Sequence, residues 1–135
     1  MNLNRQACVD LATEIAAKAS AGSASEIAVC PPFVYLDAVH QALGESAVGL
    51  GAQNIYFEDD GAFTGEISAE MAKDVGCQYV VLGHSERRHV LGETDADVAK
   101  KVSKTLAIGL LPIVCVGETL DEREAGRTAE VVASQ

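Results

Sequence analysis

Five consecutive side chains that can take part in chemistry occur in one run of the sequence, from His84 to Arg88. The run offers an imidazole, a hydroxyl, a carboxylate and two guanidinium groups. It follows the apolar segment 79–82, which has the composition of a β-strand. An imidazole can polarise a carbonyl by donating a hydrogen bond and can pass protons between adjacent oxygens. The run is therefore the first candidate for an active site.

His84 is the central residue of this run because it stands where a strand would end. Ser85 is placed to cap a short helix, and Glu86 would lie in the first turn of that helix. Backbone N–H groups at a helix start disfavour a cation, so an imidazole bonded there is expected to be neutral at pH 7. A purely structural histidine, bonded to nearby backbone, stays open as the alternative.

The remaining histidines and the cysteines are weaker candidates for a catalytic or metal-binding site. His40 and His89 are expected at the surface or at a hinge, and their spacing to His84 has no helical period that would support a metal site. The four cysteines contain no C-x-x-C pair that could nucleate a zinc site; they are Cys8, Cys30, Cys77 and Cys115. No metal is therefore expected, and the cysteines are expected to be free and mostly buried.

Three further features are assigned structural roles. Cys115 lies between two valines and is expected to be an inert buried thiol. Arg87 and Arg88, next to Glu86, are expected to form an ion-paired surface corner. The glycines of residues 49–51 lack the third glycine and the helix start of a dinucleotide fingerprint.

Composition excludes several classes of function. The 135 residues are 48% hydrophobic and carry a formal charge of −10, with no basic run. Nucleic acids and anionic membrane surfaces need clustered Lys and Arg, so neither is an expected partner. The apolar stretches are too short for a membrane span, which needs roughly 20 residues. A polar first segment and free thiols favour a cytoplasmic setting.

The elements that must position His84 alternate between strand and helix. Four short apolar runs predict strands at residues 27–30, 48–53, 79–82 and 111–116. Helices are expected at residues 4–19, at 36–43 up to Gly44, at 68–76, at 94–109, and after a capping box at Thr119 and Glu122. Gly22 is expected to terminate the first helix, and a polar loop is expected at residues 54–65.

Apolar stripes predict which faces of three helices pack. We expect Leu11, Ile15 and Ala19 to pack in the first helix; Met71, Ala72 and Val75 in the third; and Val98, Val102 and Leu106 in the fourth. The strands are apolar on both faces, as parallel strands covered on both sides should be. Strand–helix alternation calls for parallel crossovers, which fit an open doubly wound sheet or part of an eight-stranded α/β barrel. The hydrophobic periodicity of the sequence does not distinguish the open doubly wound sheet from the partial barrel.

Several segments resemble the triosephosphate isomerase family. Residues 79–88 look like its histidine segment, and residues 51–54 and 61–68 resemble its third loop. Residues 112–120 and 123–128 are similar to its fifth strand and helix, and Met1-Asn2 resembles the end of its first-strand motif Asn-Trp-Lys-Met-Asn. The resemblance covers residues 1–135 as a single incomplete domain. It implies a partial (β/α)8 TIM barrel containing the family's strands 2–5.

The resemblance also implies an activity and its residues. The family interconverts dihydroxyacetone phosphate and glyceraldehyde 3-phosphate through an enediol, in glycolysis and gluconeogenesis, without a cofactor or metal. By resemblance, His84 is the neutral electrophile at the substrate carbonyl. Ser85 would hold the histidine loop, and Glu86 would pair with the family's catalytic lysine.

Four further residues resemble those at the interface of the family's homodimer. Thr64 and Gly65 would lie on the loop that reaches into the partner's site, and Gln53 and Asn54 would brace that interface. The expected partners are thus triose phosphates and a second copy of the full-length protein.

The sequence also departs from the family pattern. The Asn, Trp and Lys of the first motif have no counterpart, nor do the base-bearing glutamate after strand six, the lid, and the phosphate loops after strands seven and eight. A barrel of this type takes roughly 250 residues. We therefore expect a fragment of about half a barrel, arising from a miscalled start codon or a partial clone. Alone it should be inactive and poorly soluble, with unpaired strand edges near residues 27 and 111.

Two other functions are left open by the residues themselves. Another phosphate-handling barrel of the aldolase type would need a Schiff-base lysine at a strand end. Lys73, Lys100, Lys101 and Lys104 all fall in expected helices instead. A non-enzymatic stub that acts as an interaction module is the other alternative.

Overall fold

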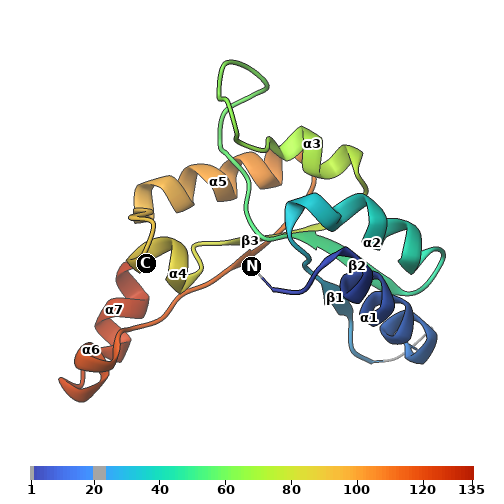
Figure 1. Cartoon of the computed structure of the whole chain (residues 1–135). Coiled ribbons are helices and arrows are strands. Elements are labelled where there is room, and N and C mark those ends of the chain that lie inside the picture. Colours follow the sequence, from blue (N-terminus) through green and yellow to red (C-terminus); the bar gives the residue numbers. More distant parts are fainter. Residues whose placement is uncertain (1, 20–23) are drawn as a thin grey trace.

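The strands form one parallel sheet in the computed structural model, which describes residues 2–19 and 24–135 (Figure 1). They are β1 (Ile27–Val29), β2 (Val48–Ala52), β3 (Tyr79–Leu82) and β4 (Leu111–Val114). Their spatial order is β1-β2-β3-β4, and every neighbouring pair is parallel. A doubly wound sheet reverses its strand order, whereas a barrel adds each strand beside the last. The order therefore favours the partial barrel.

Helices connect and follow these strands. They are α1 (Arg5–Lys18), the 3-10 turn η1 (Phe33–Tyr35), α2 (Leu36–Leu43), α3 (Ala69–Asp74), α4 (Ser85–His89), α5 (Asp95–Ile108), α6 (Leu120–Glu124) and α7 (Thr128–Ser134). In Figure 1, α3 and α5 lie together above the sheet, while α6 and α7 extend away at the carboxyl end. Among the described helices, none has the length and apolar character that crossing a membrane requires.

Capping residues set most helix boundaries as expected. The Thr94–Asp97 and Thr119–Glu122 pairs both form capping boxes, and Ser68 accepts a hydrogen bond from the backbone N–H of Met71. Gly109 ends α5 in the left-handed conformation, with φ of 82°. Met1, which resembles part of the first-strand motif, and Gly22, the expected end of the first helix, lie outside the described residues.

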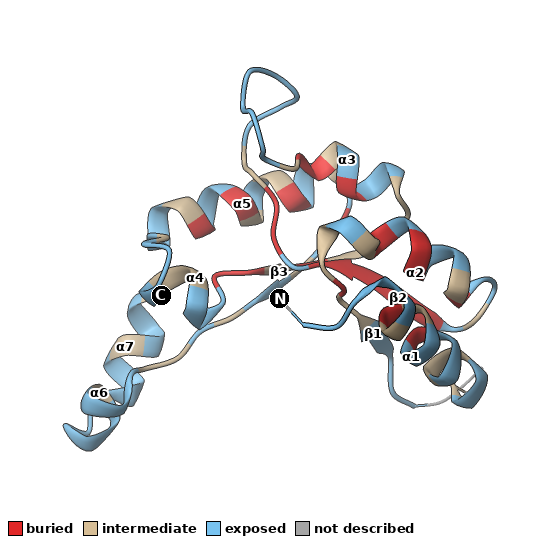
Figure 2. Cartoon of the chain, in the orientation of Figure 1, coloured by how far each residue is buried: buried red, intermediate tan, exposed pale blue. Residues whose placement is uncertain are grey.

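The core lies between the sheet and its covering helices. Every residue of β2 is buried, and β3 buries alternate residues, Val80 and Leu82. Val39 of α2 and Val98 of α5 pack into the same cluster. Figure 2 shows this burial concentrated in β2, β3 and the inner sides of α2, α3 and α5. The histidine run thus follows β3, which lies beside the fully buried strand β2.

Three of the predicted helix stripes are partly wrong. In α1, Cys8 and Ala12 are buried while Leu11 is exposed. In α3, Met71 is likewise exposed, whereas the small residues Ala69 and Ala72 are buried. Leu106 of α5 is 56% exposed. The buried stripe of α5 is Val98, Lys101 and Thr105, which a hydropathy pattern cannot find because its central member is charged.

The two outer strands are open edges, as expected. β1 and β4 each have one strand neighbour among the described residues. The prediction that all strands are covered on both faces is wrong for the two outer strands: Leu111, Ile113 and Val114 are exposed in β4, and Ile27 and Ala28 in β1. Helix α5 packs beside β4 but leaves its side chains only partly covered. The fold therefore presents a partly exposed apolar edge next to β3.

Candidate functional site

His84 lies immediately beyond the carboxyl end of β3. The neighbouring strand β4 runs parallel to β3, with Leu82 opposite Val114, so the segments after both strands emerge at the same edge. The backbone N–H of Cys115 continues this pairing by donating to the Leu82 carbonyl at 2.8 Å. Ligands in parallel α/β folds bind at this edge. The predicted position of His84 at a strand end is confirmed.

The imidazole itself caps helix α4. Nδ1 of His84 accepts a hydrogen bond from the backbone N–H of Glu86 at 3.3 Å. The expectation that Ser85 is the cap is wrong: Ser85 is the first residue of the helix and is exposed. A ring whose Nδ1 accepts a hydrogen bond carries its proton on Nε2 when neutral. Because the His84 side chain is 47% exposed, Nε2 can donate to a bound molecule.

Glu86 has a different set of neighbours from those expected. Its carboxylate oxygen Oε2 lies 3.6 Å from Nδ1 of His84, and its side chain is largely exposed. The lysine with which it is expected to pair is not among residues 1–135 as the resemblance aligns them. It also forms no ion pair with Arg87 or Arg88, whose partners are Glu93 and Asp95. The expectation that Arg87 and Arg88 are ion-paired is therefore confirmed, but their partners are Glu93 and Asp95, and the Arg88 side chain is buried rather than part of a surface corner.

A buried ionic network lies behind the histidine loop. Glu93 accepts a hydrogen bond from Nε of Arg87 at 2.9 Å and contacts the ammonium group of Lys101. The same ammonium donates to Oδ1 of Asn54 at 2.9 Å. The Glu93 and Lys101 side chains are each only 5% exposed. The network therefore joins α4, α5 and the loop after β2 from inside the molecule.

The charge on Glu93 is stabilised by its partners. Burial alone would raise the pKa of this carboxyl, but hydrogen bonds and positive charge from Lys101 and Arg87 hold the pKa below its ordinary value. Sequence reasoning did not identify Glu93, Lys101 or the burial of Arg88. A usable signal was present: Lys101 stands three residues after Val98 and four before Thr105, on a helix stripe that is otherwise buried.

The four expected interface residues occupy two different environments. Thr64 and Gly65 are exposed, and Gly65 has φ of 94°, which a glycine adopts without strain. Gln53 is exposed and donates to the Cys30 carbonyl at 2.8 Å. Asn54 is buried and committed to Lys101. The structure thus separates Asn54 from Thr64 and Gly65 rather than presenting all four on one surface.

The segment after β2 projects from the molecule as a long loop (Figure 1). Its base is closed by a hydrogen bond from the Tyr56 N–H to the Ile67 carbonyl at 2.8 Å. The Tyr56 ring lies 4.5 Å from that of Phe57 and 4.9 Å from that of Phe63. Lys104 of α5 anchors the loop through an ion pair with Asp59. Thr64 and Gly65 are therefore presented on an anchored loop.

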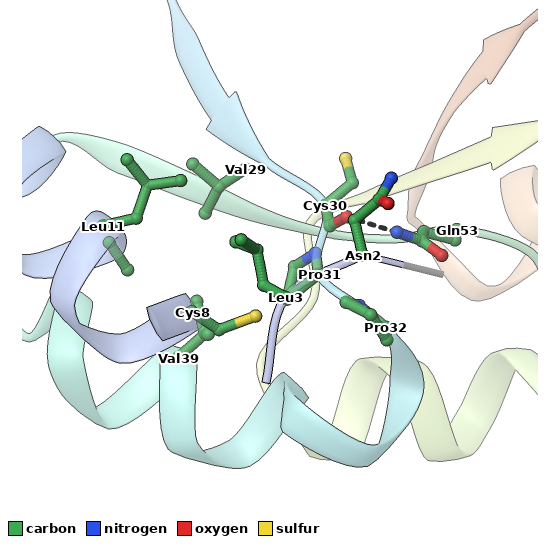
Figure 3. A pocket seen from close by; sticks show the side chains of 11 residues that line it. Asn2, Leu3, Cys8, Leu11, Val29, Cys30, Pro31, Pro32, Val39 and Gln53 are labelled. Atoms are coloured by element: carbon green, nitrogen blue, oxygen red, sulfur yellow. Dashed lines mark hydrogen bonds between the residues drawn. The ribbon is translucent and has the colours of Figure 1, made fainter. Parts of the chain in front are cut away.

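A pocket of about 180 Å³ lies beside β1 rather than beside His84 (Figure 3). Its lining combines the first residues of the chain, α1, the end of β1 and Gln53; it includes Asn2, Leu3, Cys8, Leu11, Val29 and Pro32. Among residues 2–19 and 24–135, no carboxylate, histidine or basic side chain lines it. The pocket therefore lacks groups for acid–base chemistry, and His84 stays the chemical centre.

The cysteines carry no sign of reactivity. All four are free. Burial raises the pKa of Cys77 to about 11, with a smaller contribution from Cys30, and burial also raises the pKa of Cys30. Cys115 is half-buried, which corrects the expectation that it is fully buried. His40 and His89 are exposed, as expected.

Comparison with known proteins gives one consistent result. The sequence matches the family described as Triosephosphate isomerase over residues 1–135. It is 52% identical over 135 residues to a triosephosphate isomerase of Rhodopirellula baltica, covering 100% of this chain and 53% of that protein. It is 54% identical over 127 residues to that of Alcanivorax borkumensis, covering 93% and 51%. For Moorella thermoacetica the identity is 55% over 111 residues, covering 82% and 45%. The chain spans about half the length of the curated relatives it matches.

Proposed function

The chain belongs to the triosephosphate isomerase family, and we propose that the protein built from it interconverts dihydroxyacetone phosphate and glyceraldehyde 3-phosphate through an enediol. The proposal places this protein in glycolysis and gluconeogenesis, in the cytoplasm and without a cofactor. The observation that carries it is the position and bonding of His84. The ring stands beyond the carboxyl end of β3, with Nδ1 turned to the backbone and Nε2 free to donate.

His84 is the electrophile in this proposal. Nε2–H donates to the carbonyl oxygen of the substrate, which stabilises negative charge on that oxygen as a proton leaves the adjacent carbon. The same ring then moves a proton between the two oxygens of the enediol. The hydrogen bond from the Glu86 N–H supports this role, because it keeps Nδ1 as an acceptor.

Ser85 and Glu86 support the histidine. Ser85 begins helix α4, so its backbone helps to set the direction of the loop. Glu86, with an exposed carboxylate 3.6 Å from Nδ1, is available to pair with a cation supplied from outside residues 1–135. The substrate-binding lysine and the general base are, by family resemblance, also supplied from outside these residues.

The partners are a triose phosphate and a second copy of the whole protein. Thr64 and Gly65 reach the partner's site, and Gln53 braces the loop that carries them. Asn54 contributes indirectly, since its Lys101 contact fixes the start of that loop. An aldolase-type barrel needs a Schiff-base lysine at a strand end, whereas Lys73 lies in α3 and Lys100, Lys101 and Lys104 lie in α5, so no observation favours that alternative.

The isolated 135-residue chain is expected to be inactive. Positioned proton transfer contributes about 10²–10⁴-fold to rate, so the loss of a general base alone removes several decades. A chimera with a relative of full length supplies the general base and the other family groups that lie outside residues 1–135. The barrel chimera is defined as the Rhodopirellula baltica relative with its matched 53% replaced by residues 1–135.

A coupled assay of glyceraldehyde 3-phosphate conversion tests the proposal on the chain and on the barrel chimera. We expect turnover from the chimera and none above background from the chain. A folded chimera without turnover would contradict the proposed function. Turnover by the chain alone at a rate comparable to the chimera would overturn the expectation of inactivity.

A further inference from the structure

Arg88 reaches back from helix α4 to the strand ends that flank the histidine loop. Its side chain is only 8% exposed, although it belongs to a short surface helix. Nε donates to the Gly83 carbonyl at 2.6 Å, and Nη2 donates to the Cys115 carbonyl at 3.4 Å. Nη1 pairs with Asp95 at the start of α5. One guanidinium therefore links the ends of β3 and β4 to a second helix.

The peptide units on either side of His84 are both held by hydrogen bonds to their carbonyl oxygens. The Gly83 carbonyl belongs to the unit that precedes the His84 Cα, and it is held by the Arg88 side chain. The His84 carbonyl belongs to the unit that follows, and it accepts from the backbone N–H groups of Arg87 at 2.8 Å and Arg88 at 3.1 Å. Because a peptide unit is planar, a hydrogen bond to its oxygen restricts the orientation of the whole unit. The direction in which the imidazole leaves the backbone is set by these two planes.

Gly83 makes room for this arrangement. Its φ of 67° lies in the left-handed region. A Cβ at this position would lie 2.8 Å from Nη2 of Arg88 and 3.1 Å from Cγ2 of Val98. The guanidinium thus occupies the space that a side chain at position 83 would need. The Arg88 guanidinium can therefore occupy this position because residue 83 is a glycine.

We propose that Arg88 is a positioning residue for His84, holding the Gly83–His84 peptide so that Nδ1 meets the Glu86 N–H and Nε2 faces the substrate. The inference rests on the proposed function for its catalytic consequence, but its structural part stands without it. Arg87 differs although it is adjacent, because its side chain turns to Glu93 and does not contact the peptide units around His84.

Amide hydrogen exchange of the full 135-residue chain tests the structural part; it is followed by mass spectrometry with residue-level fragmentation, at concentrations below those at which self-association is expected. The reporter is the Glu86 amide, which donates to Nδ1 of His84, and the Val80 amide in the sheet reports overall stability. In Arg88→Met we expect Glu86 to exchange at least about tenfold faster, with Val80 unchanged. Arg88→Lys should restore part of the protection, because an ammonium can still donate to one carbonyl. Arg87→Met is the matched control: it loses the ion pair with Glu93 but leaves the Gly83 carbonyl bonded to Arg88, so it should accelerate Glu86 exchange much less than Arg88→Met does.

Unchanged Glu86 exchange in Arg88→Met would overturn the proposal. Equal acceleration at Glu86 and Val80 would overturn it as well, because that pattern means a general stabilising role. The same variants in the barrel chimera give a second readout that does not depend on the spectra of the isolated chain.

In the chimera we expect Arg88→Met to lower kcat by about a hundredfold with KM within about threefold, because a misplaced catalytic group costs rate rather than affinity. The kcat of Arg88→Lys should lie between that of Arg88→Met and that of the unmutated chimera. An unaltered kcat, or a loss equal to that of Arg87→Met, would contradict the positioning role. An inactive unmutated chimera would instead contradict the proposed function and would leave the exchange result valid.

Discussion

The ammonium nitrogen of Lys101 lies 2.9 Å from the Asn54 amide oxygen and so ties helix α5 to the start of the projecting loop. The same nitrogen contacts Glu93, which in turn accepts a hydrogen bond from Arg87 in the helix that His84 caps. The second oxygen of Glu93, Oε2, is buried without a hydrogen-bond partner in the described part of the chain. The stability of the loop and that of the histidine helix therefore depend on one carboxylate and two cations.

Removing the ammonium group from this network should lower the stability of the folded chain. Lys101→Met keeps a long side chain but leaves Glu93 with one cation and Asn54 without its donor. We expect a loss of about 3 kcal/mol in the free energy of unfolding, as is typical of breaking a buried ion pair. Urea unfolding measures it. Lys100→Met, on the exposed side of the same helix and over the Phe57 ring, is the control and should cost less than about 1 kcal/mol. Equal losses in both variants would contradict the network.

The same network predicts how stability depends on pH. The pKa of Glu93 is lowered by folding, so its contribution is fully present above the ordinary value of 4.5 and is lost as pH falls through the lowered value. We therefore expect the stability difference between the unmutated chain and Glu93→Gln to shrink as pH falls below 4.5. Urea titrations from pH 6 to pH 3 measure this difference. A stability difference that grew toward low pH would contradict the prediction, because it would mean that folding raises the pKa of Glu93 instead of lowering it.

The open edge at β4 predicts self-association of the isolated chain. Leu111 and Ile113 expose apolar side chains on a strand with unpaired backbone groups on its outer side. We expect light scattering to detect oligomers at micromolar concentration and Ile113→Lys to reduce them severalfold. Val34→Lys removes an even more exposed apolar side chain away from the edge and should have little effect. A monomer that melts cooperatively would contradict this prediction.

The projecting loop predicts how copies of the whole protein associate. A bulky charge at Thr64 should disrupt a partner contact at the loop without disturbing the core, because Thr64 is exposed. In the barrel chimera we expect Thr64→Arg to raise the dimer dissociation constant at least about tenfold, as is typical of truncated or blocked central contacts. Sedimentation velocity across a dilution series measures it. Asp60→Arg places the same charge elsewhere on the loop as the control, and equal weakening by both would argue against a specific contact at Thr64.

The sequence predicted the elements well because their signals are local. Thr94 with Asp97 and Thr119 with Glu122 are capping boxes that a few neighbouring residues determine, and both are present in the structure. Strand positions were also correct to within a few residues. Choosing a barrel required the spatial order of the strands, which depends on contacts between residues far apart and which only the resemblance and the structure supplied.

The candidate site was predicted less completely. His84 could be found because its position follows from one apolar strand. The cap at His84 instead of Ser85 depends on which side chain reaches the Glu86 N–H, and local sequence favours the hydroxyl. The partners of Arg87 and Arg88 were missed because Glu93 and Asp95 come close only when the chain turns between α4 and α5. Long-range pairing decides which charges are buried, and a local pattern does not contain it.

In the proposed function, residues 1–135 provide the carbonyl-polarising imidazole of a triosephosphate isomerase. Turnover of the barrel chimera with His84→Gln, beside His89→Gln as a control on the same helix, tests it most directly. We predict that His84→Gln lowers kcat by about a hundredfold or more, with only the small loss of thermal stability expected from removing the α4 cap, while His89→Gln stays within about twofold of the unmutated chimera. Unreduced turnover in His84→Gln would contradict the proposed role of His84.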